Sequence, residues 1–131
     1  MHIVVVEEST TNCRVIRNSL AKMGYRNVAE FVQADVALKH LKQYRTDLLV
    51  TGKQLRAKTG FYLAKHVRDI PGYSSLPILM VASHYIHEDV LKGTDSGVTS
   101  FLVFPFSPKA FQRKVTTLIE NYRSNQRKTR L

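Results

Sequence analysis

The sequence predicts an α/β domain built on a parallel sheet, and two observations carry this prediction. Short apolar runs alternate five times with helical patterns of about 10–15 residues, which is typical of strand–helix units joined by right-handed crossovers. Three of the runs, at 2–6, 47–51 and 76–83, are almost continuously apolar. Such strands are buried on both faces, so we expect helices on both sides of the sheet.

In the first half of the chain, strands are predicted over 2–6, 27–32 and 47–51. The 27–32 segment alternates between apolar and polar residues, as a strand near a sheet edge does. The first helix should end at Gly24, because glycine is the preferred residue just past a helix. The second helix is expected over 34–44. The inward stripes of these two helices are predicted to be Cys13, Ile16, Leu20 and Met23, then Val36, Leu38, Leu41 and Tyr44.

The second half repeats the pattern, with strands at 76–83 and 99–104. A helix follows Gly60, and a short helix over 85–93 is expected to end at Gly93. The last helix should begin with Ser107 as N-cap and Pro108 as its first residue. The predicted inward stripes are Leu63, Ala64 and Val67 in the third helix, and Phe111, Val115, Leu118 and Tyr122 in the last.

Composition narrows the classes of protein. No apolar run approaches the roughly 20 residues of a membrane helix, and the start, "MHIVVVEEST", reaches two glutamates too early for a signal peptide. The one cysteine, Cys13, excludes an internal disulfide and fits a reducing compartment, so a cytoplasmic location is expected. Because Cys13 lies on an apolar helix face, we expect a packed thiol rather than a reactive one.

The net charge is +10, and the end of the chain is especially basic. Residues 109–131 carry seven basic side chains against one acid, Glu120, a net charge of +6. This charge could meet nucleic acid, an acidic protein or anionic lipid, or could belong to a solvated helix end. Residues 1–122 are expected to form the domain. Residues 123–131 lack apolar periodicity and are expected to be a frayed basic tail or the start of a linker.

Several segments in the same order resemble the receiver domain of bacterial response regulators, and most of all the stand-alone chemotaxis type. The resemblance covers residues 2 to about 122 and implies a flavodoxin-like fold with five parallel strands in the order 2-1-3-4-5. The segments that carry it are "VVVEE" with "RVIRNSLAKMGY", then "ADVALKHL", "TDLLV", Gly60, "LPILMVAS", and "GVTSFLVFPF" with Pro105.

In this family a histidine kinase transfers a phosphoryl group to an aspartate that ends the third strand. The resemblance also implies two acids after the first strand that help to hold Mg²⁺. A Thr or Ser ends the fourth strand, a Lys ends the fifth, and both contact the phosphoryl group. Matched position by position, the acid pair is Glu7 and Glu8, the acceptor position is Gly52, the hydroxyl position is Ala82 and the lysine position is Phe104.

Only the acid pair keeps its chemical type, and three positions lose theirs. Gly52 supplies no carboxylate for an acyl phosphate, and Phe104 cannot offset charge on phosphoryl oxygens. Thr51 and Lys53 flank Gly52, but strand alternation points both away from it; Ser83 has the same problem, and Asp47 lies at the wrong end of its strand. We therefore expect a degenerate site with no phosphoryl acceptor, no catalytic residue and no bound cofactor.

The adjacent acids Glu7 and Glu8 then need another explanation, since like charges raise each other's pKa unless a cation is near. One hypothesis is that Lys53 neutralises them in place of the metal. Alternatively, the acids face water or cap the first helix. The former pocket is expected to be small and apolar, filled by the Phe104 ring, with Phe104 or another bulky side chain packed over Gly52. The Phe104–Pro105 bond matches a Lys–Pro bond that is usually cis in receivers.

Partner contacts are expected on the face that receivers use for partners and for dimers, formed by the fourth helix, the fifth strand and the fifth helix. Tyr85, Phe101, Phe106 and Phe111 would be its anchors if they are exposed, and core residues if they are not. Phe101 matches an aromatic residue that rotates on phosphorylation in receivers, so here it should stay fixed. His84, His87 and Glu88 lie close in sequence but offer too few ligands for a structural metal, and no metal site is predicted.

These observations favour a phosphorylation-independent pseudo-receiver, a protein-interaction module rather than an enzyme. Its partner would be a histidine kinase, a regulator or a motility or secretion component. The alternative is a nucleic-acid-associated regulator that uses the basic fifth helix and tail, although no helix-turn-helix or basic–aromatic motif is present. A flavin or nucleotide enzyme on the same strand order is disfavoured, because Glu7 and Glu8 would repel a phosphate and no Gly-rich loop follows them.

Overall fold

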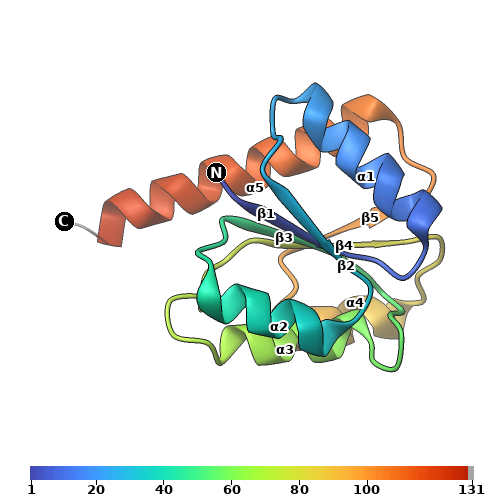
Figure 1. The fold of residues 1–131 in the computed structure, drawn as a ribbon, viewed down its shortest axis with the longest axis horizontal. Helices are drawn as coiled ribbons and strands as arrows, with labels where there is room; N and C mark the ends of the chain where they lie inside the picture. The colour runs from blue at the N-terminus through green and yellow to red at the C-terminus, as the bar shows by residue number, and fades with distance from the viewer. Residues whose placement is uncertain (130–131) are drawn as a thin grey trace.

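Five strands form one parallel sheet in the order β2-β1-β3-β4-β5 (Figure 1). The computed structural model describes residues 1–129, and the side chains of residues 1–127. The strand order and the five strand–helix units confirm the predicted flavodoxin-like α/β fold. The strands are β1 Ile3–Val6, β2 Val28–Phe31, β3 Leu48–Gly52, β4 Ile78–Ala82 and β5 Ser100–Val103.

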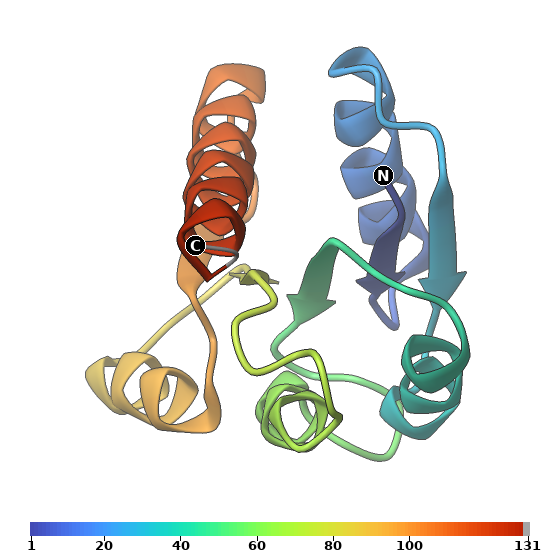
Figure 2. The ribbon, with the colours of Figure 1, turned by 90° about the vertical axis from the view of Figure 1, so that its left-hand side faces the viewer.

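Helices cover both faces of the sheet, as the continuous apolar strands predict. The helices α1 (Thr10–Lys22) and α5 (Pro108–Thr129) lie on one face (Figure 2). The other face carries α2 (Ala34–Gln43), α3 (Gly60–Arg68) and α4 (His87–Ser96). No helix within residues 1–129 combines the length and apolar character needed to cross a bilayer.

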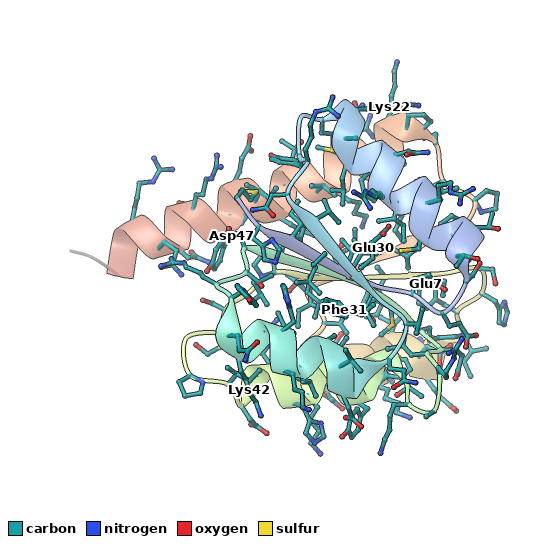
Figure 3. All side chains as sticks on the ribbon, viewed as in Figure 1. Glu7, Lys22, Glu30, Phe31, Lys42 and Asp47 are labelled. Atoms are coloured by element: carbon teal, nitrogen blue, oxygen red, sulfur yellow. The ribbon has the colours of Figure 1, made fainter. Side chains whose placement is uncertain are left out.

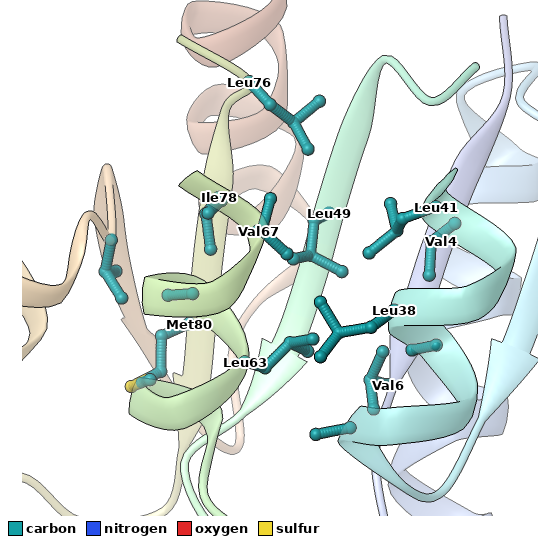
Figure 4. Close-up of a cluster of buried hydrophobic side chains, with 14 of the residues drawn as sticks. Val4, Val6, Leu38, Leu41, Leu49, Leu63, Val67, Leu76, Ile78 and Met80 are labelled. Atoms are coloured by element: carbon teal, nitrogen blue, oxygen red, sulfur yellow. The ribbon is translucent and has the colours of Figure 1, made fainter. Parts of the chain in front are cut away.

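The sheet divides the apolar core into two layers because successive strand residues point to opposite faces. Val4, Leu49 and Met80 face α2 and α3, where they meet Leu38 and Leu63 (Figure 4). The residues between them along each strand belong to the second layer, against α1 and α5. That layer includes Ile3, Val5, Leu48, Val50, Leu79, Val81, Ile16, Leu20, Phe111 and Val115.

The predicted stripe of the second helix is half wrong. In α2 the buried side chains are Ala34, Ala37, Leu38 and Leu41, whereas Val36 is exposed. Tyr44, just past the end of α2, is exposed as well. The two alanines let α2 approach the sheet closely, and this rotation of the helix turns Val36 outward.

The fourth helix ends later than predicted. It runs to Ser96 and is capped by Gly97, whose φ of 101° is in the left-handed region that favours glycine. Gly93 lies inside α4 and is its only buried residue. A Cβ at Gly93 would come within 2.6 Å of the Phe101 ring, so the glycine allows α4 to approach β5 closely.

The fifth helix begins as predicted and continues beyond its predicted end. The Ser107 hydroxyl accepts the N–H of Ala110 at 3.1 Å, which confirms Ser107 as the N-cap. The helix then continues to Thr129, seven residues past Tyr122. That residues 123–131 form a frayed tail or the start of a linker stays a prediction. This part of α5 extends past the amino ends of the strands (Figure 1). Residues 130–131 and the Lys128 side chain lie outside the described part of the chain.

Candidate functional site

The carboxyl ends of β1, β3, β4 and β5 meet at one edge of the sheet. Strand pairing sets Val6 beside Thr51 and Gly52 beside Val81, which brings the loop after β1 next to the end of β3. Glu7 lies at the opposite end of the sheet from Asp47 (Figure 3). The structure places all five sequence-selected positions at this edge: Glu7 and Glu8 just after β1, Gly52 and Ala82 as the last residues of β3 and β4, and Phe104 just after β5.

The carboxylate of Glu7 occupies the space where a side chain at position 52 would begin. A Cβ built on Gly52 would collide with Glu7 Oε2 and lie 3.1 Å from Glu7 Cδ. The expectation that a bulky side chain packs over Gly52 is therefore correct, but the side chain is Glu7 and not Phe104. The missing side chain of Gly52 and the inward position of Glu7 depend on each other.

Burial dominates the electrostatics of Glu7. Only 6% of this residue is exposed, and burial raises the pKa of its carboxyl group. The negative charge of Glu8 raises that pKa further, whereas the N–H of Ser9, which donates to Glu7 Oε1 at 3.2 Å, opposes the rise. No basic side chain among residues 1–127 forms an ion pair with Glu7.

The hypothesis that Lys53 neutralises the two glutamates is wrong. The Lys53 ammonium group donates to the carbonyl oxygen of His84 at 2.6 Å and to Asp89 Oδ2 at 3.1 Å. Lys53 follows Gly52 directly, so its side chain leaves the strand on the other side from the glycine position. It therefore reaches the loop after β4 rather than the loop after β1.

The two glutamates do not cap the first helix either. Ser9 is the N-cap of α1, and its hydroxyl accepts the N–H of Asn12 at 3.2 Å. Glu8 is exposed, so the expectation that an acid faces water is correct for Glu8 alone. Neighbours in sequence, Glu7 and Glu8 therefore occupy opposite environments.

Replacing Glu7 with glutamine is expected to stabilise the domain at neutral pH by about 1 kcal/mol. The folded state holds the Glu7 proton more tightly than the unfolded chain does, so stability falls as pH rises above the ordinary value near 4.5 towards the raised pKa. Glutamine is neutral throughout, so this loss is absent in Glu7→Gln. Urea unfolding at pH 7 and pH 4 measures the effect, and the difference between the two proteins should vanish at pH 4.

The control for this experiment is Glu8→Gln. Because Glu8 is exposed, its replacement should change the free energy of unfolding by no more than about 0.5 kcal/mol at either pH. Equal effects at positions 7 and 8 would show that general charge reduction, and not the burial of Glu7, sets the stability.

Phe104 does not fill the former pocket. Its ring packs against Phe106, with centroids 4.7 Å apart, and Phe106 stacks on Phe111 at 5.0 Å. Phe104 and Phe106 pack against the core layer between the sheet and α1 and α5. The Phe104–Pro105 peptide bond is cis, as the resemblance implies. A hollow of about 220 Å³ is left at the edge of the sheet, lined by Glu7, Glu8, Ser9, Asn12, Lys53, Gln54 and residues 81–84.

Phe111 is fully buried, so it is a core residue and not an exposed anchor. Phe106 is half-buried against the same layer. Tyr85 and Phe101 are half-buried as well and pack edge to face, with centroids 5.6 Å apart. The Phe101 ring points inward over Gly93, and that it stays fixed there is still a prediction.

Sequence reasoning missed the apolar side chains that this face does expose. Leu91 is 54% and Val103 52% exposed, and Ile86 and Val90, close to Leu91 in sequence, are exposed as well. The sequence offers no clear signal for them, because the glycine that α4 packs against β5, Gly93, is expected from sequence to end the helix.

The remaining histidines and the cysteine are not arranged as metal ligands in the described part of the chain. Within residues 1–127, no three His, Cys, Asp or Glu side chains converge as metal ligands would, and His84 and His87 are exposed. The Cys13 thiol is buried and donates to Glu30 Oε1 at 3.3 Å. The burial confirms the predicted packed cysteine. Burial, followed by that hydrogen bond, raises the pKa of this thiol to about 12, which favours an unreactive thiol.

Comparison with known proteins now identifies the family. The sequence pattern of the response regulator receiver domain matches residues 3–116. The chain belongs to the response regulator receiver family. Chemotaxis protein CheY of Pseudomonas aeruginosa is 30% identical to this receiver domain over 120 residues, spanning 92% of this chain and 97% of CheY. CheY1 of Helicobacter pylori is 28% identical over 120 residues, spanning 91% and 97% of the two chains.

Solved structures support the same assignment for this receiver domain. The structure of CheY4 of Vibrio cholerae superposes with a TM-score of 0.84 at 26% identity, over 89% of this chain and 97% of CheY4. A response regulator of Chloroflexus aurantiacus, at 24% identity, has the same fold with a TM-score of 0.84 over 91% and 98% of the chains. The domain is thus a CheY-like receiver of two-component signalling.

The side chains at the site do not fit the Mg²⁺ ion that receivers use. Mg²⁺ needs near-octahedral oxygen ligands, most of them carboxylates or waters. In this receiver domain the Glu7 carboxylate is buried against Gly52, and Gly52 adds no carboxylate of its own. Glu8 remains as an exposed acid of this edge, but it lacks the second acid and the acceptor carboxylate that complete the receiver's ligand set.

Proposed function

We propose that this receiver domain is a pseudo-receiver, which acts in two-component-type signalling by binding a protein partner and not by accepting a phosphoryl group. The observation that carries the proposal is the position of Glu7. In a phosphorylated receiver, the acceptor carboxylate and the incoming phosphoryl group both need the space beside the end of β3. Here the Glu7 carboxylate fills the start of that space.

The surrounding chemistry supports the same proposal. The hydroxyl position is Ala82, the lysine position is Phe104, and the ring of Phe104 is packed against Phe106. Lys53, which lines this edge, is bound to Asp89 and to the carbonyl of His84. Neither the hydroxyl nor the lysine of the receiver pattern is therefore present to contact a transferred phosphoryl group.

Incubation with a small-molecule acyl phosphate and Mg²⁺ tests the proposal. We expect no gain in mass by intact-protein mass spectrometry, because no carboxylate is available as nucleophile. A receiver that has the acceptor aspartate, treated in parallel, is the positive control. A stoichiometric gain of one phosphoryl group by this chain would contradict the proposal.

The surface formed by α4 and β5 is the proposed contact face for the protein partner. It presents Ile86, Val90, Leu91 and Val103, and such a group of exposed aliphatic side chains is typical of an interaction site. The partner would be a histidine kinase, a regulator or a motility or secretion component. A second copy of this domain is the other partner that this face could take.

Nucleic-acid binding stays a prediction from charge alone. Arg123 and Arg127 lie on the last described turns of α5, where they line a hollow of about 490 Å³ together with Arg45. Asp47 and Glu120 line the same hollow, so it is not purely basic. The apolar α4–β5 face favours a protein partner over a polyanion as the main ligand.

A further inference from the structure

The fourth helix has little apolar attachment to the rest of the domain. Gly93 is its only buried residue, and a glycine contributes no apolar side chain to the core. The larger side chains Val90 and Leu91 are exposed. Burial of a single leucine would stabilise such a helix by roughly 2 kcal/mol. Because neither Leu91 nor Val90 is buried in this way, other contacts must hold α4 in place.

Lys53 supplies two of those contacts from the end of β3. Its ammonium group lies 2.6 Å from the carbonyl oxygen of His84 and 3.1 Å from Asp89 Oδ2. The side chains of Lys53 and Asp89 are only 18% and 17% exposed, so water screens this ion pair much less than it screens a surface pair. One cation thus binds both the loop after β4 and the first turn of α4.

Asp89 connects this ion pair to the start of the helix. Its Oδ2 atom also accepts the N–H of Ile86 at 2.9 Å, which closes the first turn of α4. The Ile86 N–H and then the Lys53 hydrogen bond lower the pKa of Asp89, so the carboxylate stays ionised at neutral pH. The same oxygen therefore caps α4 and ties it to β3.

The loop between β4 and α4 carries the connection on to β5. The Lys53 ammonium group lies 5.6 Å from the centroid of the Tyr85 ring. The Tyr85 hydroxyl lies 2.8 Å from the carbonyl oxygen of Met80 and 3.2 Å from that of Leu102. The Tyr85 ring packs on Phe101, which in turn covers Gly93 of α4. These contacts run without a gap from the end of β3 to the exposed α4–β5 face.

We propose that Lys53 is a positioning residue that holds the β4–α4 loop and α4 in one arrangement, so that the α4–β5 face is presented permanently. The role of the α4–β5 face as a partner-binding surface rests on the proposed function. The proposal that Lys53 holds α4 in place does not. No transferred phosphoryl group is expected to position α4 in this domain. Lys53 would position it instead, through contacts made within the chain.

Hydrogen–deuterium exchange of Lys53→Met tests the inference, because methionine keeps an unbranched apolar chain and loses the charge. We expect amides of residues 84–93 to exchange at least about fivefold faster than in the unaltered protein, with β1 and α5 unchanged. Lys65→Met is the matched control, since Lys65 is exposed on α3, and it should leave exchange in 84–93 unchanged. Asp89→Asn, which retains an oxygen for the Ile86 N–H, should reproduce the faster exchange, and Lys53→Arg should restore most of the protection.

Unchanged exchange over 84–93 in both Lys53→Met and Asp89→Asn would overturn the inference, and so would an equal increase across the whole domain. These outcomes are separate from the acyl phosphate experiment. A mass gain in that experiment contradicts the proposed pseudo-receiver and leaves the Lys53 restraint standing, whereas normal exchange in the variants removes the restraint and leaves the pseudo-receiver standing.

Discussion

Gly52→Ala is expected to destabilise the domain by about 2–3 kcal/mol, although alanine is ordinarily the better residue in a strand. The added Cβ would collide with Glu7 Oε2, so the buried Glu7 carboxylate, which accepts the N–H of Ser9, would have to move. Either the carboxylate is forced out of its site or the ends of β1 and β3 separate. Urea unfolding at pH 7, with equal m-values for the two proteins, measures the loss.

A double-mutant cycle with Glu7→Ala shows whether the collision is the cause. In the Glu7→Ala background the space beside Gly52 is open, so Gly52→Ala should be neutral or stabilising by about 0.5–1 kcal/mol. The two changes should therefore be strongly non-additive. Equal losses in both backgrounds would mean that Glu7 does not occupy the position beside the end of β3.

This coupling bears on how the site could be repaired. Gly52→Asp would return a carboxylate to the acceptor position, but its Cβ meets the same Glu7 oxygen and its charge adds a second buried acid. Restoring the acceptor alone is thus expected to cost stability without providing a usable nucleophile. To restore a usable acceptor, Gly52 and Glu7 would therefore have to be replaced together.

Much of the fold could be predicted because its signals are local. The apolar run before Glu7 forms one strand, and the stripe of Leu63, Ala64 and Val67 lies on one helix. Each pattern reflects the burial of a single element, so it can be recognised in that segment of the sequence alone. The errors fall where two elements compete for the same space. Val36 is apolar, but the smaller Ala37 allows closer packing of α2 and takes the inward place.

Contacts between side chains that are far apart along the chain were the part of the site that could not be predicted from the sequence. Alternation correctly pointed Lys53 away from Gly52, yet its partner Asp89 is 36 positions further along the chain. No spacing rule links two residues on different loops, because their distance depends on the sheet that joins β3 to β4. The environment of Glu7 was hidden for the same reason, since adjacent Glu7 and Glu8 look equivalent in the sequence.

Gly60→Ala is expected to be the most damaging of the glycine replacements, with a loss of about 3–4 kcal/mol by urea unfolding. Gly60 is the first residue of α3, where alanine suits the helix, so any loss must come from contacts. Its Cβ would collide with the carbonyl oxygen of Gly52 and lie 2.9 Å from Met80 Cε. A backbone carbonyl oxygen at the end of the central strand cannot rotate away as a side chain can.

Gly93→Ala is the matched control, because its Cβ would meet a side chain and not the backbone. The atoms in question are at the tip of the Phe101 ring, 2.6 Å away, and a ring can shift. The gain of about 1 kcal/mol for alanine inside a helix offsets part of that shift, so the net loss should stay below about 1 kcal/mol. If Gly93→Ala were as damaging as Gly60→Ala, the collision with a backbone oxygen would not explain the loss at Gly60.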